Sequence, residues 1–302
     1  MSIWQTKSWQ EMLLKSKQIE KIIEIDNIFI EKRSIWLGQF WLFVLWIDIL
    51  NLNNDFLNKV KSLCKIEKSL FIQFENIDYT SSSNVELTWF TNNYYKKFIT
   101  PFTAIIDLNL SLDEILSMMK PKWRYNIKLA EKKWVIVKEV EKTKENVEIF
   151  YNLMLETTSR DNFNWNSLDY YISFLDSIKE SKLFIAYFEE KAISAGIFTY
   201  VWDSAIYYYW ASTSDINYRN LMSPYLLQWT AICKAKELNC KIYDFLWVAT
   251  PWEENSHLQW VTDFKSKFTA NIIKVSEPYI FINNKLNTIY YNYLEKLKDK
   301  II

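Results

Sequence analysis

Glycine is nearly absent from this sequence, which has 2 Gly and 15 Trp among its 302 residues. A usual glycine content of about 7% would give roughly 21. Several tryptophans stand where a turn favours glycine: Trp134 between a helical and a strand-like run, Trp202 between two strand-like runs, and Trp252 after the proline of a turn. A bulky aromatic residue is unfavourable at positive φ.

We therefore hypothesise that many of these tryptophans are glycine in the native protein, since some bacterial lineages read the codon UGA as glycine. The alternative is a protein that is truly rich in tryptophan. Trp9 and Trp229 lie in helix-like stretches and fit their positions as tryptophan.

Histidine and cysteine are also scarce. The single histidine, His257, excludes a His-paired catalytic triad and a multi-histidine metal site, and we expect no metal or other cofactor. Cys64, Cys233 and Cys240 form no Cys-x-x-Cys pair. Reduced thiols and a cytoplasmic protein are therefore expected.

Long apolar runs and an excess of charge are missing as well. No apolar run reaches the roughly 18 residues of a membrane span, and Met1 to Lys15 lacks the apolar core of a signal peptide. Lys+Arg and Asp+Glu both count 36, so net charge favours no class of partner. A hydrophobic share of 50% can form a buried core.

Helical and strand-like patterns alternate along the whole chain, which predicts α/β layers in both halves. Ser111 to Glu114 has the capping-box pattern of a helix start, and Pro121 should break that helix. Helices are expected near 8–17, 54–64, from 111 to the break at Pro121, from there to 133, and near 144–158, 167–178, 220–238, 257–268 and 285–299. Strands are expected near 22–31, 40–46, 69–75, 102–108, 134–140, 182–188, 192–201, 204–211 and 242–246, with two more before the last helix.

The segment from Lys120 to Lys138 is basic, since it contains seven Lys or Arg residues and a single acid, Glu131. Such a run can bind the phosphates of RNA or of a nucleotide sugar. On spacing alone, a solvated helix face is the better interpretation.

Several motifs, in order along the chain, resemble those of the Fem family of bacterial aminoacyl transferases. Residues 122–130 read KWRYNIKLA and 133–135 read KWV, similar to the family's K-x-R-Y-N-I-R-x-A and K-G-V. Residues 207–212, YYYWAS, resemble Y-x-Y-x-G-A-S, and 243–247, YDFLW, resemble Y-D-F-x-G. Phe264-Lys265 opens an F-K-x-x-F pattern. In the K-G-V motif, Trp134 stands at the position where the family has glycine.

The resemblance implies an α/β fold of two GNAT-like (acyl-CoA N-acyltransferase-like) domains that share a cleft. The first would comprise 1–146 plus a returning C-terminal helix in 284–302, and the second 147–283. No heptad pair for a coiled-coil arm is visible, so the chain is similar to the compact members.

The activity implied is transfer of an amino acid from aminoacyl-tRNA to the stem peptide of a peptidoglycan precursor, which forms an interpeptide bridge. The acceptor would be UDP-MurNAc-pentapeptide or a lipid-linked precursor, and the latter would bring the enzyme to the membrane surface.

The resemblance also suggests site residues. Lys265 matches the family's key lysine, with a role in transition-state charge or in phosphate binding near the 3′ end of the tRNA, and Glu75 matches an acidic position that assists the amine. Without the family, they would be an exposed helix lysine and a surface carboxylate at a strand end.

Tyr170, Tyr207 and Tyr209 match tyrosines that contact the acceptor, and Phe264 and Arg124 are further substrate-binding candidates. A tyrosine-rich strand is otherwise ordinary core and sheet surface.

Two positions depart from the family pattern. An arginine that grips the acceptor phosphates falls at Asn166, and a phosphate-binding lysine falls near Leu13, with Lys15 as the nearest replacement.

Two other functions stay open. One is a GNAT-like N-acyltransferase that uses a CoA donor, and the other is a non-catalytic protein that binds cell-wall precursor. Dependence on charged tRNA separates the first alternative from the Fem reaction.

Overall fold

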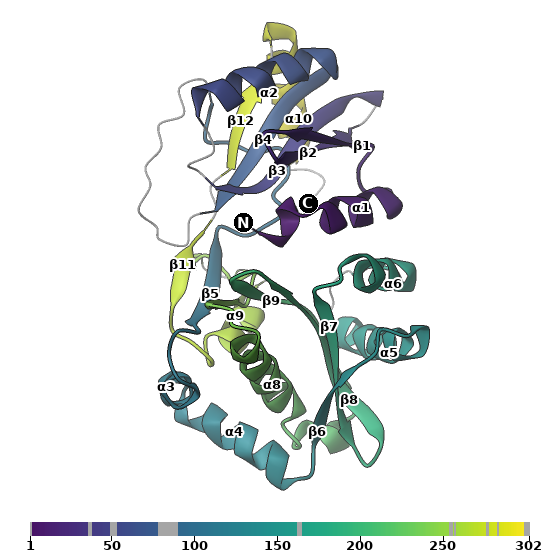
Figure 1. Ribbon diagram of the computed structural model, residues 1–302, viewed down its shortest axis with the longest axis vertical. Helices are drawn as coiled ribbons and strands as arrows, with labels where there is room; N and C mark the ends of the chain where they lie inside the picture. The colour runs from purple at the N-terminus through teal and green to yellow at the C-terminus, as the bar shows by residue number, and fades with distance from the viewer. Residues whose placement is uncertain are drawn as a thin grey trace. The chain divides into compact units, whose positions relative to one another are not determined.

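The computed structural model describes residues 2–35, 38–48, 53–77, 90–161, 165–253, 256, 258–275, 278–282 and 284–298. The chain forms two compact units (Figure 1). Unit 1 consists of Met1–Pro101 and Lys274–Ile302, and unit 2 consists of Phe102–Ile273. Within the described residues, no helix is both long enough and apolar enough to cross a bilayer.

Unit 1 is built on a five-stranded sheet with the strand order β1-β2-β3-β4-β12. Strands β3 and β4 are parallel, and the other neighbours are antiparallel. Its elements are η1 (Ile3–Gln5), α1 (Lys7–Lys15), β1 (Lys21–Ile25), β2 (Ile28–Ser34), β3 (Phe40–Asp48), α2 (Asn54–Ile66), β4 (Ser69–Ile77), β12 (Pro278–Ile282) and α10 (Lys285–Lys298).

The expected strand at 22–31 is in fact a hairpin. Strands β1 and β2 are joined by Asp26 and Asn27, both at positive φ. Asp and Asn tolerate this conformation better than other non-glycine residues, and a two-residue hairpin turn of this kind requires it at both positions.

Unit 2 is built on a seven-stranded sheet with the order β11-β5-β10-β9-β8-β7-β6. Its strands are β5 (Phe102–Asp107), β6 (Ile136–Val140), β7 (Ser181–Phe188), β8 (Lys191–Val201), β9 (Ser204–Ser212), β10 (Ile242–Asp244) and β11 (Ile272–Lys274). Its helices are α3 (Leu112–Met118), α4 (Pro121–Lys132), α5 (Lys144–Asp161), α6 (Leu168–Ser177), α7 (Ile216–Arg219), α8 (Ser223–Glu237) and α9 (Gln259–Lys265).

Helices cover both faces of the unit 2 sheet. Helix α8 packs on β7, β8 and β9 from one side, and α5 and α6 pack from the other (Figure 1). A large core cluster forms between α8 and the sheet and includes the buried side chains of Phe198, Tyr243 and Phe245. Helix α4 lies beside α8 and packs against it.

The segment 102–146 belongs structurally to unit 2. The sequence placed it in the first domain, but β5 pairs with β10 and β6 pairs with β7. These pairings between strands distant in sequence give no local signal, so the division falls at Pro101.

The backbone at three tryptophans has the glycine-like conformation. The values of φ are 61° at Trp134, 50° at Trp202 and 26° at Trp247. Trp134 follows the end of α4, where Val135 N donates to Ala130 O at 3.1 Å, which is the pattern of a left-handed helix cap. Trp252 was expected to have positive φ as well, and this expectation is wrong, because the residue is not among those at positive φ.

The parallel strands β9 and β10 separate at the point where β10 ends, and we call this point the fork. Strand β10 pairs with the beginning of β9, from Ile242 opposite Ser204 to Asp244 opposite Ile206, and then ends. Strand β9 continues to Ser212. Asp244 accepts hydrogen bonds from Thr103 Oγ1 and, at 2.7 Å, from Leu246 N, and these turn the chain away from the sheet.

Candidate functional site

Two cavities adjoin in unit 2, and Trp210 and Trp260 line both of them. We call them the arginine cavity, of about 320 Å³, and the lysine cavity, of about 330 Å³. The arginine cavity is lined by Arg160, Asp161, Ile193, Trp210, Ser212, Thr213, Tyr218, Arg219, Met222, Ser223, Pro224, Tyr225, Trp260 and Phe264. The lysine cavity is lined by Met154, Trp165, Asn166, Tyr171, Tyr207, Tyr208, Tyr209, Trp210, Trp247, Leu258, Trp260, Val261 and Lys265.

Helix α9 contributes lining side chains to both cavities. Phe264 lines the arginine cavity, and its ring stacks on that of Trp210 with centroids 5.9 Å apart and planes at 12°. The next residue, Lys265, lines the lysine cavity. Successive helix residues point about 100° apart, so one helix end can serve two neighbouring cavities.

Lys265 is buried at the fork between β9 and β10. Its side chain is 3% exposed, so it is not the surface lysine that helix position alone suggests. Nζ donates to Leu246 O at 2.7 Å and to Trp247 O at 3.0 Å, the two carbonyls that follow β10. The ring of Tyr207 lies 5.8 Å from Nζ.

Burial lowers the pKa of Lys265 to about 7, against the smaller opposing effect of the Asp244 carboxylate. A lysine with such a pKa holds its proton in part of the molecules at neutral pH. In its protonated form Lys265 can stabilise a developing negative charge or donate its proton. It releases the proton more readily than a lysine with the ordinary pKa does.

Of the three predicted tyrosines, Tyr207 and Tyr209 line the lysine cavity, and Tyr170 contacts Tyr209. Tyr207 and Tyr209 project from β9, and the hydroxyl oxygens of Tyr209 and Tyr170 are 2.9 Å apart. Burial raises the pKa of both β9 tyrosines well above the ordinary value, so they act as neutral hydrogen-bonding groups. Tyr170 reaches this cluster from α6.

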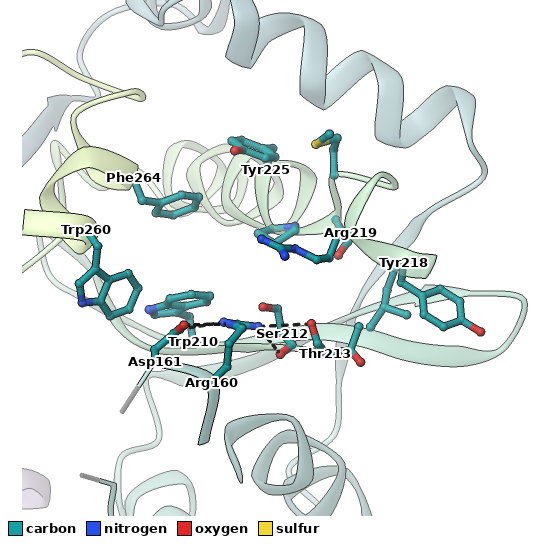
Figure 2. Close-up of a pocket in the computed structure, with 14 residues that line it drawn as sticks. Arg160, Asp161, Trp210, Ser212, Thr213, Tyr218, Arg219, Tyr225, Trp260 and Phe264 are labelled. Atoms are coloured by element: carbon teal, nitrogen blue, oxygen red, sulfur yellow. Dashed lines mark hydrogen bonds and ion pairs between the residues drawn. The ribbon is translucent and has the colours of Figure 1, made fainter. Parts of the chain in front are cut away.

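The arginine cavity combines cations with aromatic rings (Figure 2). Arg160 forms a two-point ion pair with Asp161, with both N···O distances 2.8 Å. Arg219 points into the cavity opposite that pair (Figure 2), and among the described residues it forms no ion pair. An arginine beside aromatic rings suits a ligand that carries both phosphate and a planar ring.

Three other predicted residues lie elsewhere. Arg124 is on α4, where its Nη1 donates to Ser117 O at 2.9 Å and to Met119 O at 2.7 Å, so the guanidinium caps the end of α3. Lys15 ends α1 and Glu75 lies in β4, and both belong to unit 1.

Glu75 is a buried carboxyl group rather than a surface one. It is 1% exposed, and its Oε1 accepts hydrogen bonds from Gln73 Nε2 and Phe98 N, each at 3.2 Å. Burial raises the pKa of Glu75 to about 8, so the group is largely protonated at neutral pH. His257 lies outside the described residues.

Arg219 and Trp260 were missed by the sequence interpretation. Arg219 ends the four-residue helix α7 and Trp260 lies in the first turn of α9. Neither position shows a periodicity or a spacing that singles it out. Only the tertiary fold brings these residues, far apart in sequence, into the lining of one cavity with Trp210 and Ser212 of β9.

The chain matches a family model and several solved structures. The FemAB family model matches residues 67–192 and 173–296, which together span more than half of the chain. No curated protein gives a significant match.

Among solved structures, the crystal structure of FemX is 16% identical, covers 97% of this chain and 94% of its own, and superposes with a TM-score of 0.84. L-PGS from Bacillus licheniformis is 11% identical, covers 98% and 96%, and gives a TM-score of 0.53. The C-terminal DUF2156 domain of an Agrobacterium fabrum protein is 11% identical, covers 97% and 95%, and gives a TM-score of 0.62. At such identities these likenesses concern the fold, which is that of two GNAT-like α/β domains.

The Fem-type resemblance of the sequence motifs is thus confirmed: the protein belongs to the FemAB family, the transferases of peptidoglycan bridge formation.

Proposed function

We propose that the protein transfers an amino acid from aminoacyl-tRNA to an amine on the stem peptide of a peptidoglycan precursor. The observation that carries this proposal is the buried Lys265 at the fork of β9 and β10, beside two adjoining cavities. The family match supports the same reaction class.

In this reaction the acceptor amine attacks the ester carbonyl of the charged tRNA. The new C–N bond forms, the C–O bond to the tRNA 3′ end breaks, the nitrogen loses a proton and the leaving oxygen gains one. Negative charge develops first on the carbonyl oxygen and then on the leaving oxygen, and the enzyme must stabilise both.

Lys265 is the group in unit 2 best suited to meet these charges. Two of its ammonium protons are directed at Leu246 O and Trp247 O, which fix the position of Nζ. The third is available to an oxygen bound in the lysine cavity. Low solvent exposure strengthens this interaction, because water does not screen it.

The arginine cavity suits the nucleotide part of a substrate. Arg219 offers charge to a phosphate, and the stacked rings of Phe264 and Trp210 show how planar groups pack there. The acceptor is either UDP-MurNAc-pentapeptide or a lipid-linked precursor. We place the reaction in the cytoplasm, with contact to the membrane surface in the lipid-linked case.

The test is an incubation of the full-length protein with mixed charged tRNAs and either precursor, with and without ribonuclease, followed by product mass. The proposal expects a mass gain of one amino-acid residue that ribonuclease abolishes. A gain that survives ribonuclease and needs an acyl-CoA would instead support the CoA-dependent transferase. Binding of precursor without any transfer would support the binding protein.

A pair of matched variants tests the role of Lys265. Lys265→Met should lower the transfer rate by about a hundredfold or more, the usual cost of removing one group that stabilises an oxyanion. Lys241→Met is the control, since Lys241 forms an exposed ion pair with Asp203 in the same unit, and it should leave the rate unchanged. Equal rates for both variants would remove Lys265 from the mechanism.

A further inference from the structure

Helix α4 has one face buried in unit 2 and one face open to solvent. Trp123, Ile127 and Ala130 are buried. The exposed face carries Lys122, Tyr125, Lys128 and Lys132, which follow one another at intervals of three, three and four residues. Such intervals place the four side chains along one side of a helix. We call this set the α4 stripe.

The lysines of the α4 stripe differ from one lysine on each of four other helices. In α1, α2, α5 and α8, a lysine that is exposed or half-buried pairs with an acid three or four residues away. These pairs are Lys7–Glu11, Lys59–Asp55, Lys144–Glu148 and Lys234–Glu237. Within the described part of the chain, Lys122, Lys128 and Lys132 form no ion pair. These three ammonium groups therefore have no carboxylate of the described residues in direct contact, although Glu131 lies on the same helix.

An exposed aromatic ring lies among these charges. Tyr125 is 62% exposed at the middle of the stripe, although a tyrosine usually buries most of its ring. Unpaired lysines that flank an exposed aromatic residue are typical of surfaces that bind nucleic acid, where phosphates meet the charges and a base or ribose packs on the ring.

Helix α4 packs on the wall of the arginine cavity through its buried face. On the buried face of α4, the Trp123 ring packs on Tyr225, with centroids 5.1 Å apart, and Tyr225 lines that cavity. Lys120 N, at the start of α4, donates to Lys267 O just after α9, at 3.2 Å. The arginine cavity and the α4 stripe therefore belong to one packed part of unit 2, with the stripe on the solvent-exposed face of the helix whose other face packs on the cavity wall.

We infer that the α4 stripe binds the sugar–phosphate backbone of the RNA donor close to its aminoacylated end. This inference rests on the proposed function, because it takes the donor to be a charged tRNA. RNA fits better than a membrane surface, since the positive charges lie in a narrow row around one aromatic ring and no apolar side chain in the stripe is placed to enter a lipid layer.

The test measures binding of a fluorescein-labelled RNA hairpin with an acceptor-stem sequence and a single-stranded 3′ end, by anisotropy over a range of salt concentrations. The triple variant K122Q/K128Q/K132Q should bind about tenfold or more weakly near physiological salt, and the slope of log affinity against log salt should fall by about two to three. Tyr125→Ala should weaken binding about fivefold with the slope unchanged.

The matched control is K144Q/K191Q/K241Q, which removes three exposed, ion-paired lysines of the same unit. It should bind the hairpin as the wild type does, and all variants should have unchanged melting temperatures, because every altered side chain is exposed. A stripe variant with wild-type affinity and slope would overturn the inference and leave the proposed function intact.

Two further outcomes separate the two proposals. A wild-type protein that binds no hairpin at low salt, and that transfers from an acyl-CoA, would overturn both. Loss of binding to phosphatidylglycerol vesicles in the stripe variant, with hairpin binding retained, would overturn the inference in favour of a membrane contact.

Discussion

At the scale of single residues, burial reverses the ordinary titration behaviour of a base and of an acid. Lys265 in unit 2 has a pKa lowered to about 7, and Glu75 in unit 1 has a pKa raised to about 8. Each shift links the stability of its own unit to pH, and the two linkages have opposite signs.

For Lys265, the unfolded chain keeps its proton up to about pH 10.5, whereas the folded chain loses it near pH 7. Between these values the unfolded state binds more protons, so raising the pH favours folding. The free energy of unfolding of the wild type should rise, relative to that of Lys265→Met, by about 1.4 kcal/mol per pH unit. Urea denaturation at pH 7 and pH 9, followed by tryptophan fluorescence, measures this. A constant difference would mean that Lys265 keeps its proton in the folded state.

For Glu75, the folded chain holds its proton up to about pH 8, whereas the unfolded chain loses it near pH 4.5. The stability that this group contributes is therefore complete below pH 4.5 and is lost as the pH rises through 8. Relative to Glu75→Gln, the wild type should lose about 1.4 kcal/mol per pH unit in this window. Thermal melts of both proteins at pH 5 and pH 7.5 give the comparison, and parallel pH dependences would contradict it.

Trp134 and Trp202 are expected to be glycine in the native protein. They are 82% and 52% exposed and have positive φ, so the indole rings add little burial while the backbone carries a cost of about 1–2 kcal/mol. Trp134→Gly and Trp202→Gly should each stabilise the protein by about 0.5–1 kcal/mol, after the greater freedom of glycine in the unfolded chain is subtracted. Chemical denaturation measures this, and peptide masses of protein from the native cell identify the residues directly.

Trp9 is the control for this substitution. It lies in α1, is 5% exposed and packs edge-on against Trp4, with ring centroids 6.3 Å apart. Trp9→Gly should destabilise the protein by about 3–5 kcal/mol, because it leaves a cavity in a helix of unit 1. Stabilisation at all three positions would show that exposure and φ do not determine the effect.

At the scale of secondary-structure elements, local patterns predicted most of the fold. The capping box at Ser111 is formed, and Pro121 is the first residue of α4 rather than part of α3. What the patterns could not supply is the pairing of distant strands. The fork of β9 and β10 lies at residues 206 and 244, and nothing within either segment shows that they are neighbours.

The same limit applies to the candidate site. Motif matches named Lys265, Phe264 and the tyrosines of β9, and these do lie around the two cavities. The motif that contains Arg124 also matched, yet its guanidinium serves the end of α3. A residue type in a motif does not determine whether its side chain faces a ligand or a helix end.

Replacement of Arg124 by Met tests this structural role. Loss of the hydrogen bonds to Ser117 O and Met119 O should lower the free energy of unfolding by about 1–2 kcal/mol, because the α3 carbonyls lose a charged donor. The KM for charged tRNA should not change. A higher KM with unchanged stability would return Arg124 to the substrate-binding residues.

At the scale of the whole molecule, the two units differ in how the chain builds them. Unit 2 is continuous, from Phe102 to Ile273, and unit 1 needs both ends of the chain. Strand β12 completes the unit 1 sheet beside β4, and Tyr291 of α10, 3% exposed, contacts the ring of Phe71 with centroids 5.3 Å apart.

The fragment 102–273 should therefore fold alone, with a cooperative thermal transition, and the fragment 1–101 should not. Fusing residues 274–302 to the shorter fragment through a flexible linker should restore its transition, because the open edge of β4 is then paired. Circular dichroism melts of the three fragments give the result. A cooperative transition in fragment 1–101 alone would show that β12 and α10 are dispensable.

The balance of charge has a consequence for how quickly a polyanion meets this protein. With 36 basic and 36 acidic residues, the molecule as a whole exerts no long-range pull on RNA. The α4 stripe acts only within the Debye length, about 8 Å at physiological salt. Encounters should then proceed at the unsteered rate, about 10⁵–10⁶ M⁻¹s⁻¹. Preference among tRNAs would consequently be expressed in how long each stays bound rather than in how often each arrives.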